Sequence, residues 1–224
     1  MLAIKDIQKI MPNIKYREYL WHLWHENKTE QDLSWEEHTH WNGYVWSDTE
    51  VIKYYSIFRH KDIIQDKKIV DVGSFFHQPS DFIHNKVKSY TGLNIDTRIE
   101  DLWNLGCKIM SSNIPCKFIV ADGETYDLAS MDCDTICSLG VFYQVENPKK
   151  FIHNLSQSSA NNLIFQSRFH NESLANTQGL PDKWNGRVLT VWNKQDIISE
   201  IEKYWKITSV DVYDKKDLHN IGAK

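Results

Sequence analysis

The chain has 224 residues, of which 41% are hydrophobic and 25% charged, so it has enough apolar material for a folded core. A formal net charge of −4 argues against a broad phosphate-binding surface. No apolar run approaches the ~20 residues of a membrane-spanning helix. Charged residues interrupt the first apolar residues of the chain, and no secretory cleavage site follows them. The four cysteines form no CxxC pair. We therefore expect a cytoplasmic protein with reduced cysteines.

Residues 1–60 are predicted to form a helical cap, because aromatic and aliphatic residues recur there at helical spacing. One amphipathic helix is expected over residues 16–24 and a second over Asp48–His60. Trp21 and Trp24 are interpreted as packing residues. The loop aromatics could either pack or close over a ligand; they are Trp41, Tyr44 and Trp46.

Residues 61–224 alternate short β-branched runs with helical stretches, a pattern typical of a mostly parallel α/β sheet flanked by helices. The predicted strands cover residues 69–72, 90–96, 116–122, 134–139, 162–167 and 207–213. The predicted helices cover residues 80–88, 100–111, 147–155 and 194–204.

Glycines and carboxylates follow several of these strands. In an open parallel sheet, ligands bind beyond the carboxyl ends of the strands, where the strand order reverses. The candidates at these ends are Gly73, Ser74, Asp96, Asp122, Gly123, Leu139 and Gly140. Glycine lets a backbone approach a ligand closely, and a carboxylate after the second strand can bind ribose hydroxyls. A nucleoside-like ligand is therefore expected, although Asp96 and Asp122 fit ordinary turns equally well.

Four segments resemble the motifs of class I S-adenosylmethionine-dependent methyltransferases, in the family's order, over roughly residues 67–213. They are KKIVDVGSFFHQPSDF, YTGLNID, FIVADGETY and DTICSLGVFYQVENPKKFIHNL. The resemblance implies a Rossmann-like fold. Two departures stand out: Gly73 is alone where relatives carry two or three glycines, and Gln144 stands where many have histidine.

The resemblance also implies roles for single residues. Asp71 and Gly73, with Ser74 beside them, would shape the loop under the methionine portion, and Asp96 would bind the ribose. Asp122 would bind the adenine amino group, with Gly123 as its neighbour. Leu139 and Gly140 would flank the sulfonium, and Phe142 or Tyr143 would face the acceptor.

A general base is needed only when the acceptor holds its proton tightly at neutral pH. The candidates are His77, directly after the glycine turn, then His40 in the cap, and Tyr143. Closely spaced histidines in the cap lack supporting cysteine or carboxylate spacing, so no metal site is expected.

The expected function is methyl transfer from S-adenosyl-L-methionine to a small molecule, such as a sugar or a polysaccharide or natural-product intermediate. Acidic residues in the cap disfavour nucleic acid as the acceptor. Two alternatives remain: a non-catalytic partner subunit of the same fold, and a nicotinamide-dependent oxidoreductase, against which the missing GxGxxG motif argues. The oligomeric state is left open.

Overall fold

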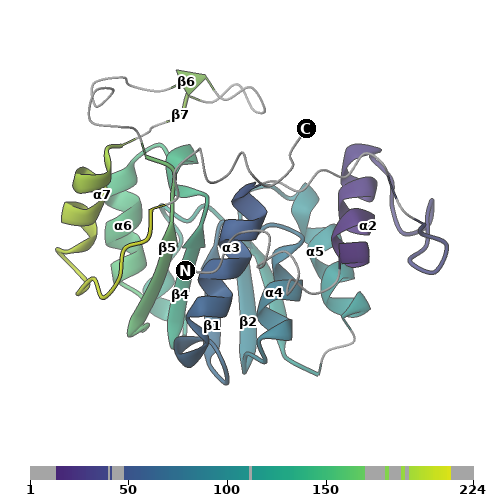
Figure 1. The fold of residues 1–224 in the computed structure, drawn as a ribbon, viewed down its shortest axis with the longest axis horizontal. Helices are drawn as coiled ribbons and strands as arrows, with labels where there is room; N and C mark the ends of the chain where they lie inside the picture. The colour runs from purple at the N-terminus through teal and green to yellow at the C-terminus, as the bar shows by residue number, and fades with distance from the viewer. Residues whose placement is uncertain are drawn as a thin grey trace.

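A five-stranded parallel sheet forms the centre of the computed structural model, which describes residues 14–39, 41, 48–110, 113–169, 180–181, 188–189 and 192–212. The strands run in the order β3-β2-β1-β4-β5 (Figure 1). Their bounds are β1 Lys68–Val72, β2 Ser89–Asn94, β3 Cys116–Val120, β4 Thr135–Leu139 and β5 Asn162–Gln166. All four neighbouring pairs are parallel, which confirms the predicted Rossmann-like α/β fold.

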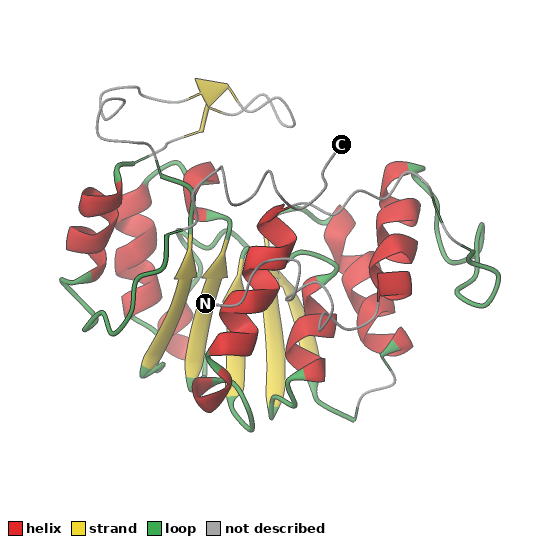
Figure 2. Cartoon of the chain, viewed as in Figure 1, coloured by secondary structure: helices red, strands yellow, loops and turns green. Residues whose placement is uncertain are grey.

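Helices cover both faces of the sheet (Figure 2). They are α2 Ile14–His25, α3 Asp48–Arg59, α4 Gln78–His84, α5 Arg98–Ile109, α6 Pro148–Ser156 and α7 Lys194–Ile201. Strand residues alternate between two cores. Ile69 of β1 lies in a cluster with residues of α2 to α5, whereas Val70 lies in a cluster with residues of α6 and α7. Every helix predicted from the sequence is confirmed, with shifts at the ends.

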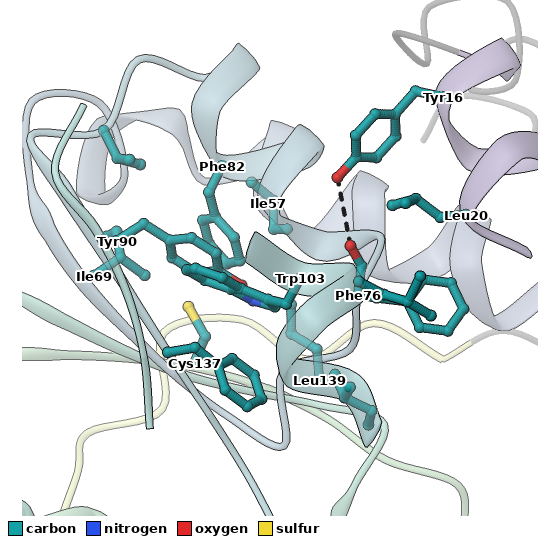
Figure 3. Close-up of a cluster of buried hydrophobic side chains, with 14 of the residues drawn as sticks. Tyr16, Leu20, Ile57, Ile69, Phe76, Phe82, Tyr90, Trp103, Cys137 and Leu139 are labelled. Atoms are coloured by element: carbon teal, nitrogen blue, oxygen red, sulfur yellow. Dashed lines mark hydrogen bonds between the residues drawn. The ribbon is translucent and has the colours of Figure 1, made fainter. Parts of the chain in front are cut away.

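The cap helices share the first of these cores with the sheet. Figure 3 shows Trp103 and Tyr90 at its centre, with Tyr16 of α2 donating a hydrogen bond to the Phe76 carbonyl at 3.4 Å. Trp21 and Trp24 pack against the same cluster, as their interpretation as packing residues predicts. The cap is therefore held by apolar burial, which is the dominant favourable contribution to folding.

The predicted strand near the end of the chain is wrong, and two other strands are shorter than expected. Residues 207–212 form no strand, and Val210 and Val212 stay exposed, because no strand among the described residues pairs with this segment. Instead β6 Leu180–Pro181 and β7 Val188–Leu189 form a separate antiparallel pair, drawn above the ends of β4 and β5 in Figure 1. β2 and β3 also end two residues earlier than predicted.

Within the described residues, no helix is both long and apolar enough to cross a membrane.

Candidate functional site

Two left-handed glycine turns meet where the strand order reverses, between β1 and β4. Gly73 has a φ of +85° and Gly140 a φ of +77°. A Cβ atom on Gly73 would lie 2.6 Å from the Cβ of Val141, so the turn after β4 crosses directly over the turn after β1. Both glycines are thus required by backbone geometry, and they define the part of the sheet edge where ligands bind in this architecture.

The end of β2 lies beside this turn. The Ala121 amide donates to the Asn94 carbonyl at 3.0 Å, so the segments that follow β2 and β3 lie next to each other. Asn94, which the sequence analysis missed, ends β2 and donates from Nδ2 to the Ser74 carbonyl at 2.9 Å. A polar residue at the last position of a strand was the only signal for it.

Asp96 faces this edge in an ion pair with Arg98. Arg98 Nε lies 2.9 and 3.2 Å from the two Asp96 carboxylate oxygens. The guanidinium stacks 4.8 Å from the ring centroid of Trp24, so the cap reaches the carboxylate predicted to bind ribose.

Asp122 and Gly123 form the turn after β3. Asp122 Oδ1 accepts a hydrogen bond from the Glu124 amide at 2.9 Å, which is the turn that the sequence left open as an alternative. A Cβ on Gly123 would lie 2.4 Å from Val72 Cγ1, so this glycine is needed for packing. Contact of Asp122 with adenine stays a prediction.

The side chains of Asp71 and Ser74 point into the core below the edge. Ser74 Oγ lies 2.7 Å from the Tyr90 hydroxyl and accepts a hydrogen bond from Trp103 Nε1 at 3.1 Å. The Tyr90 hydroxyl also donates to Asp71 Oδ2 at 2.9 Å. Burial raises the pKa of the Asp71 carboxyl to about 6. Ser74 would therefore contact a cofactor only through its backbone.

This shift predicts a pH dependence of stability. The pKa of Asp71 is higher in the folded chain than its usual 3.8, so protonation favours the folded state. The contribution of Asp71 to the free energy of unfolding is therefore fully present below pH 3.8 and is lost as the pH rises through about 6. Relative to Asp71→Asn, the wild type should lose on the order of 2 kcal/mol of unfolding free energy between about pH 4 and pH 7. Urea unfolding of both proteins at these pH values measures the difference, and parallel profiles would contradict the assignment.

Two of the three predicted bases, His77 and Tyr143, lie among the described residues, in different surroundings. His77 precedes α4 and is only 2% exposed, with Nε2 3.7 Å from Glu50 Oε1. Burial, together with Arg17 and Lys53, lowers the pKa of His77 well below its usual value, so the ring is neutral. The sequence placed His77 on a loop near the edge, whereas the structure encloses it beneath the cap.

Tyr143 follows β4 in the short helix η3 Phe142–Gln144, where the Arg168 guanidinium lies 5.0 Å from its ring centroid. β7 contacts this helix.

His40 lies outside the described residues, as do Tyr44 and Trp46. Trp41 stacks on His22 with ring centroids 5.0 Å apart. Among the described residues, no group of three or more potential metal ligands comes together.

Buried charges connect the cap helices α2 and α3 to α4, and no local pattern in the sequence pointed to them. Arg17 of α2 forms an ion pair with Asp81 of α4 and lies 3.6 Å from Glu50 of α3. Lys53 of α3 extends over Gly140: a Cβ there would lie 2.8 Å from Lys53 Cε and 3.2 Å from Gln166 Oε1. Lys53 thus places an amine at the ends of β4 and β5.

The residues at this edge fit an adenosyl sulfonium. The Gly73 turn presents backbone close to β4, and Asn94, Asp96 and Asp122 supply polar groups beside adjacent strand ends. Phe76, which could have blocked the edge, is fully buried and packs against Trp21, with ring centroids 5.2 Å apart.

No family model matches the sequence, and no curated protein matches it significantly. Solved structures do match the fold. An S-adenosylmethionine-dependent methyltransferase from Mesorhizobium loti has a TM-score of 0.54 and 11% identity, over 66% of this chain and 80% of that one. The N-terminal domain of EvdMO1 with S-adenosylhomocysteine bound has a TM-score of 0.55 and 12% identity, over 73% of this chain and 80% of that one.

The [4+2]-cyclase SpnF also matches, with a TM-score of 0.58 and 12% identity over 75% of this chain and 62% of that one. The chain therefore has the fold of the class I methyltransferases. Because a protein named as a cyclase shares that fold, the reaction has to be argued from the site.

Proposed function

We propose that this chain binds S-adenosyl-L-methionine at the carboxyl edge of β1 to β4 and transfers its methyl group to a small molecule. The observation that carries the proposal is the pair of left-handed turns at Gly73 and Gly140, which follow the neighbouring strands β1 and β4 at the switch point of the sheet and touch through Val141. The matched fold and the carboxylates beside neighbouring strand ends support it.

Each residue would then have a distinct task. Gly73 would bring its backbone near the methionine portion, Asn94 and Asp96 would face the ribose, and Asp122 would face the adenine. The bound donor supplies an activated methyl group, so the protein's work is to hold donor and acceptor in line, which can contribute up to ~7–11 kcal/mol. Tyr143 and the β6–β7 pair would form one boundary of the acceptor site, since β7 contacts η3, the helix that carries Tyr143.

Binding of S-adenosylhomocysteine tests the proposal directly. We expect isothermal titration calorimetry to give one site per chain. Asp96→Ala should weaken binding by about 1–3 kcal/mol, because the ribose hydroxyls would lose the carboxylate that accepts their hydrogen bonds.

Arg98→Met is the matched control, because it removes the other half of the ion pair and leaves the carboxylate in place. It should leave the affinity unchanged or improve it. Absence of binding to the wild-type chain would end the proposal, and equal affinities of wild type and Asp96→Ala would remove Asp96 from the site.

A further inference from the structure

Lys53 is a buried lysine at the acceptor side of the edge. The residue is 9% exposed, although lysine is almost never buried without a partner. Among the described residues, the structure shows no hydrogen bond or ion pair to its amine. The stem lies on Gly140, where the missing side chain makes room for it: Nζ is 3.4 Å and Cε 2.8 Å from the position of a Gly140 Cβ.

Gln166 meets Lys53 at the same point. Its Oε1 lies 3.2 Å from the Gly140 Cβ position, is buried, and has no hydrogen-bond partner among the described residues. A buried carbonyl without a donor is costly, so it favours a nearby group that can donate. A protonated Lys53 has three N–H donors, and its Nζ lies beside the same Gly140 position as Gln166 Oε1.

Charged groups on β1, α2, α3 and α4 act on Lys53, whereas its neighbours Gly140 and Gln166, at the ends of β4 and β5, are uncharged. Asp71 of β1, Glu50 of α3 and Asp81 of α4 attract a proton to the amine, whereas Arg17 of α2 repels it. Burial outweighs the attraction and lowers the pKa of Lys53 below its usual 10.5. The three carboxylates also disfavour a carboxylate or phosphate ligand at this place.

We propose that Lys53 removes the proton from a phenol-type or enol-type hydroxyl acceptor, and that Gln166 positions the resulting ammonium. This inference rests on the proposed function. The acceptor oxygen gives its proton to the neutral amine and forms the new bond to the methyl carbon, while the electron pair of the broken carbon–sulfur bond stays on sulfur. The ammonium then releases its proton to water.

The class of hydroxyl follows from acidity. A phenol loses its proton near pH 10, as tyrosine does, so its pKa lies close to that of an amine, and a lysine whose pKa is lowered holds more of the neutral amine that accepts this proton. An ordinary aliphatic alcohol holds its proton far too tightly for an amine to remove it. A phenol or enol is therefore the acceptor that this lysine matches.

Trace labelling with acetic anhydride tests the inference on the full chain, with the exposed Lys149 as internal reference. The pH dependence of labelling at Lys53 should give a pKa below the usual 10.5 of lysine. Gln166→Leu should lower it further, because the ammonium loses its hydrogen-bond acceptor.

Ligand protection then tests the acceptor class. In the presence of S-adenosylhomocysteine, phenol should slow Lys53 labelling about threefold or more relative to Lys149, whereas benzoate, which has the same ring and a negative charge, should not. Protection by benzoate instead, or by neither probe, would overturn the inference while the proposed function stands. A failure of S-adenosylhomocysteine to bind in calorimetry would instead remove the proposed function.

Discussion

Arg17→Met should lower the free energy of unfolding by about 3–5 kcal/mol, the usual cost of leaving one member of a buried ion pair unpaired. The Arg17 side chain is 0% exposed and that of its partner Asp81 is 1% exposed. The substitution leaves the Asp81 carboxylate enclosed without its cation. Burial already raises the pKa of Asp81, so the group has little capacity to remain ionised alone.

Urea unfolding at neutral pH measures this loss. Arg59→Met is the matched control, because Arg59 pairs with Asp211 near the surface and should cost less than about 1 kcal/mol. Replacing both partners, in Arg17→Met with Asp81→Leu, should recover much of the stability. A loss in Arg17→Met no larger than in Arg59→Met would show that the buried pair does not hold the cap to the sheet.

Gly73→Ala should lower the free energy of unfolding by about 2–5 kcal/mol, nearly as much as Arg17→Met. A left-handed backbone costs a residue with a Cβ about 1–2 kcal/mol, and overpacking adds about 1–3 kcal/mol. The added Cβ would meet all three side-chain carbons of Val141 at 2.6–2.8 Å. The variant should also lose S-adenosylhomocysteine binding, because the turn and the site are the same structure.

Two further variants separate strain from crowding. Val141→Gly added to Gly73→Ala removes the steric contact and should leave only the backbone cost. Gly140→Ala has a similar positive φ, but its Cβ meets the flexible end of Lys53, so its loss should stay near the backbone cost. If Gly73→Ala unfolds no more easily than Gly140→Ala, the contact between the turns is not tight.

The order of strands and helices was predictable because it depends on local patterns. β-branched runs such as Ile69 to Val72 alternate with amphipathic segments, and this alternation permits little besides a parallel α/β sheet. Asn147 and Pro148 mark the start of α6 correctly, since the Asn147 side chain accepts from the Lys150 amide at 3.1 Å.

Side-chain direction was less predictable. Asp71, Ser74 and His77 were all assigned to the site because they flank Gly73, yet their side chains lie in the buried interface between the sheet and the cap. A strand alternates its faces with a period of two, so neighbours in the sequence point to opposite cores, and only the packed helices decide which face is open.

The sequence by itself determined the α/β class, most of the element positions and the strand ends that carry glycine and carboxylate, because periodicity and turn chemistry act over a few residues. Only the tertiary structure brought Lys53 from α3 to Gly140 and Gln166, and Arg17 from α2 to Asp81. These contacts join segments far apart in the chain. The energies of these contacts depend on distance and desolvation, neither of which can be inferred from the local sequence.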